Sequence, residues 1–315
     1  MSARLRRWGK RLGIALLVVV VAVTVAAAIY DAVTPGGESP RALYPGPFVH
    51  ADGHLLAYER WGTSGTPIVL LGGFIEPSDV WRKVGPLLAR DGHRVYALDL
   101  PPFGYSARQG PYDLAAWSAE LEGFERALGI VRPVLVGHSL GAATVVGEAL
   151  RDPGALRGIV LLDGDALGTG GPPGWIGDLA LDPWFTALYR VLTRSDFLFR
   201  RGLQRAYGPD GPPLTSAEVA RWQRPFRVAG TAQALKDMLP HGIPGWTTTD
   251  LARVHGVRVA VVWGALDTVD SVAAGRRTAR LLHAPLALLP RAGHLSMLEA
   301  PAGVAAAVAG LTRNG

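Results

Sequence analysis

Short apolar segments alternate with longer helical patterns along most of the chain. The apolar segments are Leu55–Trp61, Ile68–Leu71, Val95–Leu98, Val134–Val136, Ile159–Leu162, Val259–Trp263 and Leu286–Leu289. The helical patterns between and after them are Leu114–Leu128, Leu140–Leu150, Val272–Leu282 and Ala302–Leu311. Almost continuous apolar runs are typical of parallel strands that are covered on both faces. The alternation therefore predicts the α/β class, with a mostly parallel central sheet flanked by crossover helices.

One long interval, between Leu162 and Val259, interrupts this alternation. It is rich in aromatic residues, and its Thr215–Glu218 segment has the spacing of a capping box, which predicts the start of a helix. We interpret residues 165–255 as a helical cap inserted before the penultimate strand. Ligand sites of open α/β sheets lie at the carboxyl ends of the strands, so we expect some cap aromatics to line a pocket there.

The first 30 residues have a different pattern. Five basic residues precede an uncharged stretch of 18 residues, Gly13–Tyr30. As a helix this stretch would be about 27 Å long, close to the roughly 30 Å hydrocarbon core of a bilayer. The length favours a retained transmembrane helix with a cytoplasmic N-terminus and the catalytic domain outside. The alternative is a secreted protein whose signal is cleaved near the small residues Ala26–Ala28.

These patterns divide the chain into five predicted parts. Residues 1–30 form the membrane anchor or signal, and residues 31–48, rich in Pro and Gly, form a linker. Residues 49–164 form the first part of the core, residues 165–255 the cap, and residues 256–315 the second part of the core.

Charge and composition exclude several functions. The net charge is +6, but five of the 32 Lys and Arg residues lie in the N-terminal segment, which leaves 27 against 26 acidic residues. The body is therefore nearly neutral, and we expect no nucleic-acid partner. The chain has no cysteine, which excludes disulfides, a thiolate nucleophile and cysteine-based zinc sites.

The segment Val134–Val145, "VLVGHSLGAATV", holds the strongest candidate for catalysis. Ser139 stands between a predicted strand and a predicted helix, with Gly137 and Gly141 two residues to either side. This G-x-S-x-G pattern predicts a sharp strand-to-helix turn that exposes a nucleophilic serine at the sheet edge. The N–H of Leu140, at the start of the helix, is suited to stabilising an oxyanion.

A serine hydroxyl needs a base, and the base needs an orienting carboxylate. His294 follows the last predicted strand and is the candidate base, whereas His138 should point away from the Ser139 hydroxyl.

Asp267 ends the penultimate strand and is the candidate acid, with Asp270 as its rival. Two further carboxylates, Asp163 and Asp165, follow the preceding strand and are weaker candidates. The order Ser139, Asp267, His294 is the chain order of this type of triad.

The chain resembles the α/β-hydrolase superfamily, in its cap-bearing esterase and lipase branch. The resemblance covers roughly residues 46–313. It is carried by five segments: Gly137–Gly141, Trp263–Asp267, Gly293–His294 and the two loops "LLGGFIEPSDVW" and "ALDLPPFGYSA".

In the family, the first of these loops supplies the other oxyanion amide, which the resemblance places at Phe74. The family usually has a histidine at the position of Gly72. The glycine leaves the backbone N–H of Phe74 in place as a donor, but it leaves open which residue anchors the loop. Asp99 in the second loop, where Pro102 replaces the usual glycine, is structural in the family.

The resulting hypothesis is a serine hydrolase that acts on a small-molecule ester with an apolar acyl or alcohol portion. It would need no metal or organic cofactor. A serine nucleophile argues against the dehalogenases and epoxide hydrolases of this fold. Two alternatives stay open: the same triad acting on an amide, lactone or carbon–carbon bond or in perhydrolysis, and a non-catalytic binding module. The glycine-rich segment 168–174 lacks the end of a phosphate-binding loop and is interpreted as a hinge to the cap.

Overall fold

The fold is described from a computed structural model, which covers residues 3–33, 36–169, 184–239 and 242–313. Its centre is an eight-stranded sheet with the strand order β1-β2-β4-β3-β5-β6-β7-β8. The strands are β1 (Phe48–Ala51), β2 (His54–Trp61), β3 (Pro67–Leu71), β4 (Arg94–Leu98), β5 (Val134–His138), β6 (Gly158–Leu162), β7 (Val259–Gly264) and β8 (Leu286–Leu289). The α/β class with a mostly parallel sheet flanked by helices, as predicted from the sequence, is confirmed.

The amino-terminal edge of the sheet differs from the simplest expectation. Strand β2 pairs antiparallel with both β1 and β4, whereas every pair from β4 to β8 is parallel. The sequence analysis missed β1, because it is only four residues long and includes the exposed, polar His50. The turn into β2 is formed by Asp52 and Gly53, both at positive φ (48° and 90°), which is the geometry of a tight hairpin.

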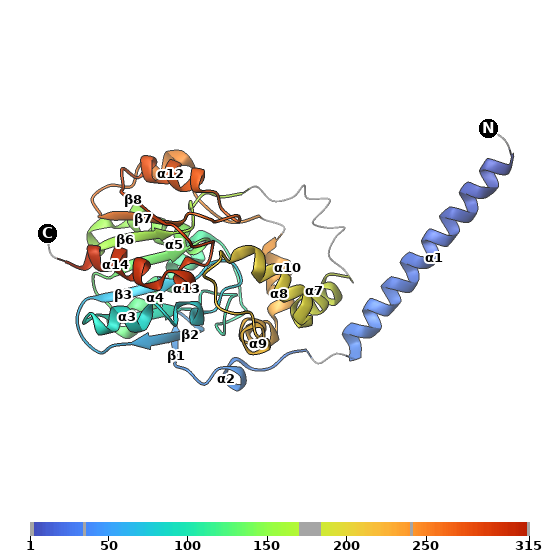
Figure 1. Ribbon diagram of the computed structural model, residues 1–315. Coiled ribbons are helices and arrows are strands. Elements are labelled where there is room, and N and C mark those ends of the chain that lie inside the picture. Colours follow the sequence, from blue (N-terminus) through green and yellow to red (C-terminus); the bar gives the residue numbers. More distant parts are fainter. Residues whose placement is uncertain (1–2, 34–35, 170–183, 240–241, 314–315) are drawn as a thin grey trace.

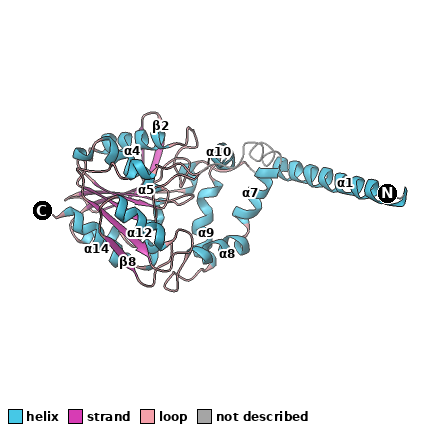
Figure 2. Ribbon diagram, turned by 90° about the horizontal axis from the view of Figure 1, so that it is seen from above, coloured by secondary structure: helices cyan, strands magenta, loops and turns pink. Residues whose placement is uncertain are grey.

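Helices cover both faces of the sheet (Figures 1 and 2). One face is covered by α4 (Leu114–Leu128), α5 (Gly141–Arg151) and α12 (Val272–Leu281), and the other by α3 (Gly85–Arg90) and α14 (Pro301–Thr312). Along β3 the side chains alternate between the two hydrophobic layers: Val69 and Leu71 face one layer, and Ile68 and Leu70 face the other. All four are fully buried, as expected for a strand inside a doubly covered sheet.

The predicted insertion between β6 and β7 is helical in its described part. It contains α7 (Trp184–Arg194), α8 (Asp196–Ala206), α9 (Ser216–Gln223), α10 (Thr231–Met238) and α11 (Thr248–Leu251). Thr215 caps α9 by accepting a hydrogen bond from the Glu218 N–H (3.2 Å), whereas the Glu218 side chain turns to Arg82 and Trp222. The predicted hinge at residues 168–174 falls mostly outside the described residues.

The N-terminal helix α1 (Ala3–Val33) extends away from the body (Figure 1). Its segment Arg11–Tyr30 is long and apolar enough to cross a membrane, with a mean hydropathy of 3.0 and 6% of its residues buried in the protein. The helix continues three residues past the predicted boundary at residue 30.

The following segment, predicted as a linker, is held against the cap. It contains the short helix α2 (Pro40–Leu43), capped by the Ser39 hydroxyl, which accepts from the Ala42 N–H. Glu38 forms an ion pair with Arg227 and a backbone bridge to Val228. These contacts fix the segment between α1 and the sheet onto the insertion.

Candidate active site

The turn from β5 into α5 holds Ser139 in a left-handed backbone conformation, with a φ of 48°. The Ser139 N–H donates to the Leu162 carbonyl oxygen (3.0 Å), which ties the turn to the neighbouring strand β6. A Cβ atom on Gly137 would lie 2.3 Å from the Gly141 carbonyl oxygen. The residues on either side of the serine therefore approach so closely that no side chain fits between them, as the sequence pattern predicts.

His294 and Asp267 meet at the same edge of the sheet. His294 Nδ1 lies 2.8 Å from Asp267 Oδ2, and both residues are buried, with 6% and 9% of their surface exposed. The other carboxylate oxygen, Oδ1, accepts from the N–H groups of Val269 (2.8 Å) and Asp270 (2.9 Å). The backbone N–H of His294 donates to the Ala206 carbonyl oxygen at the end of α8 (2.8 Å). The insertion therefore also helps to position His294.

The alternative carboxylates are placed elsewhere. The backbone carbonyl of Asp270 accepts from the Trp263 indole (3.1 Å), and no described hydrogen bond joins its carboxylate to His294. Burial, together with the charges of Asp165 and Asp267, raises the pKa of Asp270 to about 6. Asp165 pairs with Arg277 at 2.9 Å. Of these carboxylates, the one that touches the His294 ring is that of Asp267.

Two cavities meet at Ser139 and His294. One, of about 420 Å³, is lined mainly by apolar side chains, among them Phe74, Leu203 and Trp222. The other, of about 530 Å³, has mixed walls, in which Asp165, Thr169 and Arg277 lie beside apolar side chains. Ser139 thus stands between an apolar cavity and a more polar one, which we call the polar cavity. In the part of the chain that is described, no hydrogen bond joins the Ser139 hydroxyl to the His294 ring.

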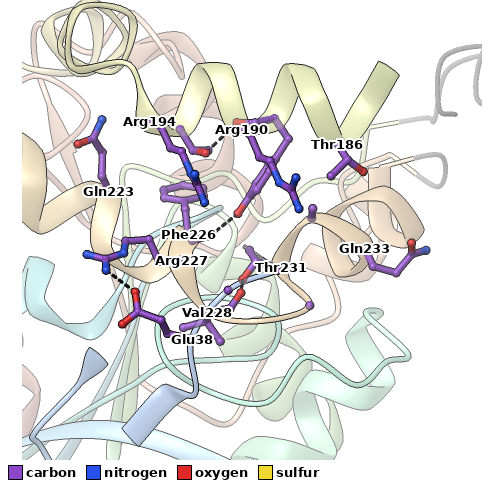
Figure 3. A pocket seen from close by; sticks show the side chains of 16 residues that line it. Glu38, Thr186, Arg190, Arg194, Gln223, Phe226, Arg227, Val228, Thr231 and Gln233 are labelled. Carbon is purple, nitrogen blue, oxygen red and sulfur yellow. Dashed lines mark hydrogen bonds and ion pairs between the residues drawn. The ribbon is translucent and has the colours of Figure 1, made fainter. Parts of the chain in front are cut away.

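A larger cavity, of about 630 Å³, has a separate set of lining residues (Figure 3). It is formed between α7, α10 and the segment before α2, and its walls carry Arg190, Arg194 and the Arg227–Glu38 ion pair. Neither Ser139 nor His294 lines it. Since the chemistry-bearing side chains are elsewhere, size alone does not identify the active site.

The two predicted oxyanion donors flank Ser139. Leu140 is the N-cap residue of α5, and Phe74 lies in the loop after β3 and lines the apolar cavity. A Cβ atom on Gly73 would lie 2.8 Å from Ser139 Cβ, so this loop packs directly against the serine. Among the described residues, no acceptor takes a hydrogen bond from either amide. Both N–H groups thus lack a protein acceptor within the described residues.

A buried charged pair beneath the serine was missed by the sequence analysis. His138, which is fully buried, lies 2.8 Å from Glu76 Oε2 through Nδ1 and 2.7 Å from the His294 carbonyl oxygen through Nε2. Because a carbonyl and a carboxylate can only accept, both ring nitrogens carry protons and the ring is a cation. Glu76 also accepts from the Gly73 N–H (2.6 Å) and so anchors the loop that lacks its usual histidine.

The pKa values of this pair fit its charged state. Burial alone lowers the pKa of His138, but the charge of Glu76 and its hydrogen bond raise it to about 9. Burial opposes ionisation of Glu76, yet His138 and the Gly73 N–H hold the pKa of that carboxylate below its ordinary value. Each partner therefore keeps the other ionised in an environment that would neutralise either one alone.

Asp163 completes this buried network. Its Oδ1 accepts from the Gly264 N–H (2.6 Å), its Oδ2 accepts from the Ser296 hydroxyl, and Oδ2 lies 3.8 Å from His138 Nε2. Burial raises the pKa of Asp163 to about 7. Asp163 therefore joins the turn after β6 to the end of β7 and to the short helix α13 (Ser296–Glu299).

Asp99 is placed as the resemblance implies. Its two carboxylate oxygens accept from the N–H groups of Ser78 and Tyr105 (2.7 Å for Tyr105), and it does not line either cavity at Ser139. Burial raises the pKa of Asp99 to about 7. Within the described residues, no group of three or more His, Asp or Glu side chains is arranged to hold a metal ion.

Comparison with known proteins identifies the family. The family model of the alpha/beta hydrolase fold matches residues 66–301. The chain is 27% identical over 254 residues to the uncharacterized hydrolase YugF of Bacillus subtilis, an alignment that covers 79% of this chain and 91% of the relative.

Two solved structures share the fold. A meta-cleavage product hydrolase from Pseudomonas fluorescens has a TM-score of 0.68 at 20% identity, covering 84% of this chain and 97% of that one. A membrane phospholipase A has a TM-score of 0.69 at 24% identity, covering 98% of this chain and 100% of that one.

The buried pair predicts a pH-dependent stability that Glu76→Gln should change. The pKa of His138 is raised from 6.5 to about 9 in the folded protein. The stabilisation that protonated His138 gives to the folded state is therefore complete below pH 6.5 and is lost as the pH rises through about 9. The lowered pKa of Glu76 adds a contribution that is lost only at acidic pH. We expect Glu76→Gln to lower the free energy of unfolding by about 3 kcal/mol at pH 7. That difference should shrink by pH 10.

The measurement is denaturant unfolding of both proteins in detergent at pH 7 and pH 10. Glu120→Gln is the control, because Glu120 pairs with the partly exposed His54 away from the site. A difference between wild type and Glu76→Gln that stays constant from pH 7 to pH 10 would show that His138 is not a cation in the folded protein.

Proposed function

The chain belongs to the α/β-hydrolase family, and on this basis we propose that it is a serine hydrolase of carboxylic esters. The observation that carries the proposal is the hydrogen bond between His294 Nδ1 and Asp267 Oδ2 beside a serine at a strand-to-helix turn. Ser139 and His294 line the same two cavities, although 155 positions separate them in the sequence. A nucleophile, a base and an orienting acid at one cavity are the parts that acyl transfer requires.

In this mechanism the Ser139 hydroxyl attacks the ester carbonyl carbon while His294 Nε2 takes its proton. The Asp267 carboxylate accepts from Nδ1–H, which keeps Nε2 unprotonated in the resting state and stabilises the imidazolium that forms. His294 then protonates the leaving alcohol. Water, activated by the same ring, releases the acid from the acyl-enzyme and restores Ser139. Hydrogen bonds of this kind often tighten only when substrate is bound, so the hydroxyl and the ring need to approach at that step.

The amides of Phe74 and Leu140 would bind the oxygen that becomes negative during the attack. Leu140 lies at the N-terminus of α5, where the aligned peptide dipoles also favour negative charge. Removing one such donor typically costs about 100–1000-fold in turnover. Glu76 and His138 would act only as positioning residues, because they hold the Phe74 loop and the His294 backbone.

The two cavities indicate what kind of ester fits. The apolar cavity, with Phe74, Phe199 and Trp222 in its walls, suits a hydrocarbon portion of the substrate. The polar cavity beyond Ser139, with Arg277 and Thr169, suits the more hydrophilic portion. An amphiphilic ester with its carbonyl at Ser139 would occupy both spaces.

We also propose that α1 is retained as a membrane anchor, with the catalytic domain outside the cytoplasm. The helix is in contact with the insertion through the Trp184 indole, which donates to the Thr24 hydroxyl (2.9 Å). This contact supports a helix that remains part of the folded protein.

Replacement of Ser139 by alanine should remove the activity. With p-nitrophenyl esters of graded chain length, we expect wild-type kcat/KM to rise from acetate to medium-chain acyl groups as the apolar cavity fills, and Ser139→Ala to lose at least about 10⁴-fold in kcat. Ser216→Ala, an exposed serine at the start of α9, is the matched control and should keep the wild-type rate. Turnover that survives in Ser139→Ala would rule out this nucleophile.

A second comparison separates the two candidate acids. Asp267→Asn should lower kcat by about 10⁴-fold, because an amide at this position favours the wrong tautomer of His294. Asp270→Asn should keep most of the wild-type kcat, since its carboxylate has no described hydrogen bond to the ring. Steady-state kinetics with one soluble ester test this, and equal losses in the two variants would contradict the assignment of Asp267.

The N-terminus of the mature protein tests the anchor. We expect sequencing of protein extracted from membranes to begin within the first few residues of the chain. A new terminus near Asp31 would show that α1 is a cleaved signal.

A further inference from the structure

The insertion carries an unusual concentration of exposed apolar side chains. Outside α1, ten large apolar residues of the described chain are exposed, and six of them lie within fifteen positions on α7 and the start of α8. These six, which we call the cap patch, are Trp184, Leu188, Val191, Leu192, Phe197 and Leu198. Contiguous exposed apolar surface on a soluble domain marks a site of interaction with a partner or a membrane.

The spacing of the cap patch gives α7 one apolar face. Trp184, Leu188 and Val191 follow each other at steps of four and three residues, which places them on one side of the helix. The other side packs inward: Phe185 and Tyr189 contact the main hydrophobic core, and the Tyr189 hydroxyl donates to the Phe226 carbonyl (2.7 Å). The exposed face is therefore additional to what the fold needs for its own packing.

The cap patch begins against the proposed membrane anchor. The Trp184 indole donates to the Thr24 hydroxyl, and both ribbon views show α7 beside the C-terminal end of α1 (Figures 1 and 2). Thr24 lies six residues before the end of the apolar span at Tyr30, which is about 9 Å along the helix. This is the depth at which amphipathic helices lie in a bilayer surface, and tryptophan is enriched there.

The charge around the cap patch favours the same partner. The segment Trp184–Ala206 contains five arginines and a single acidic residue, Asp196. Arg190 and Arg194 emerge from α7 on the side of the 630 Å³ cavity (Figure 3), and three more arginines lie on α8. Basic residues beside an apolar helix face are attracted to anionic lipid headgroups.

The cap patch is continuous with the apolar cavity at the serine. Leu192 and Leu198 belong to the patch and also line the cavity that contains Ser139 and His294. Phe199 and Leu203, further along α8, continue the same wall toward the serine. An apolar path therefore leads from the exposed face of the insertion to the reacting groups.

We propose that the cap patch rests on the bilayer that holds α1 and that the ester enters the apolar cavity from the lipid phase. This inference rests on the proposed ester hydrolysis and narrows its substrate class to esters that partition into membranes. The hydrocarbon portion stays in an apolar environment from the bilayer to the cavity. Only the polar portion is transferred, into the polar cavity beyond Ser139.

A label experiment tests the docking without relying on catalysis. The chain has no cysteine, so Phe197→Cys and Val131→Cys each give one site for the environment-sensitive fluorophore NBD. The two positions are equally exposed, at 69% and 70%, but Val131 precedes β5 and lies at the sheet edge opposite the serine. Each full-length variant is reconstituted into vesicles of phosphatidylcholine and phosphatidylglycerol.

We expect emission from position 197 to shift to the blue and to be quenched by nitroxide-labelled lipid, and emission from position 131 to do neither. Equal behaviour at the two positions would overturn the proposal. A blue shift at position 197 without quenching by the lipid would also overturn it, because the patch would then be covered by protein, such as a second copy of the chain.

An activity experiment tests the entry route. The double variant Leu188→Asp with Phe197→Asp changes two patch residues that do not line the cavity at the serine. In vesicles we expect its hydrolysis of bilayer-dissolved p-nitrophenyl palmitate to fall at least about tenfold. Its hydrolysis of water-soluble p-nitrophenyl butyrate should stay within about twofold of wild type. Val131→Asp is the control and should change neither rate.

The two arms separate failure of this inference from failure of the proposed function. If wild type does not hydrolyse p-nitrophenyl butyrate, ester hydrolysis is wrong, and the label experiment still reports whether the patch meets lipid. If the double variant loses both activities equally, or neither, the patch does not deliver substrate and the entry route is wrong.

Discussion

The sharp turn between β5 and α5 is the constraint on which the whole site depends. It requires a non-glycine residue, Ser139, at a φ of 48°, a conformation that costs of the order of 1–3 kcal/mol and persists only when its surroundings enforce it. Contacts with neighbouring elements hold the turn in this conformation. Strand β6 accepts the Ser139 N–H, and Gly137 and Gly73 leave no room for a side chain beside the turn. Packing of the doubly covered parallel sheet thus offsets the free-energy cost of the strained turn. The turn places Ser139 at the two cavities, at the carboxyl edge of the strands.

Beneath the turn, a buried ion pair connects parts that are far apart in the sequence. His138 extends from the end of β5 to Glu76 in the loop after β3 and to the backbone of His294 after β8. Taking one charge out of water without a partner would cost several kcal/mol, so neither residue tolerates loss of the other. The proposed nucleophile, one proposed oxyanion donor and the proposed base are therefore held by one short chain of contacts. The insertion adds a second constraint, since α8 accepts the His294 N–H at Ala206 and lines the apolar cavity.

The sequence is informative where the physics is local. Apolar runs predict buried strands, and the Gly137–Gly141 pattern predicts the turn, because both depend on residues that are adjacent in the chain. Strand β1 was missed because four residues with an exposed histidine carry little periodic signal, although Asp52-Gly53 was a hairpin signal.

Asp267 and Asp270 are three residues apart at the same strand end, and only the fold shows which carboxylate touches His294. The Glu76–His138 pair joins residues 62 positions apart. It could be found only once β3 and β5 were known to be neighbours, although Gly72 in place of the family's usual histidine indicated that another anchor was needed.

The central claim is that Ser139 is a nucleophile activated by its setting, and covalent labelling tests it most directly. A fluorophosphonate mimics the tetrahedral stage of acyl transfer and reacts only with a serine that has both a base and oxyanion donors. The experiment is to treat the folded, full-length protein with the probe, digest it and locate the adduct by mass spectrometry. The account predicts one phosphonylated residue, Ser139, with labelling lost in His294→Ala. Folded wild-type protein that takes up no probe, or that carries it on a different serine, would contradict it.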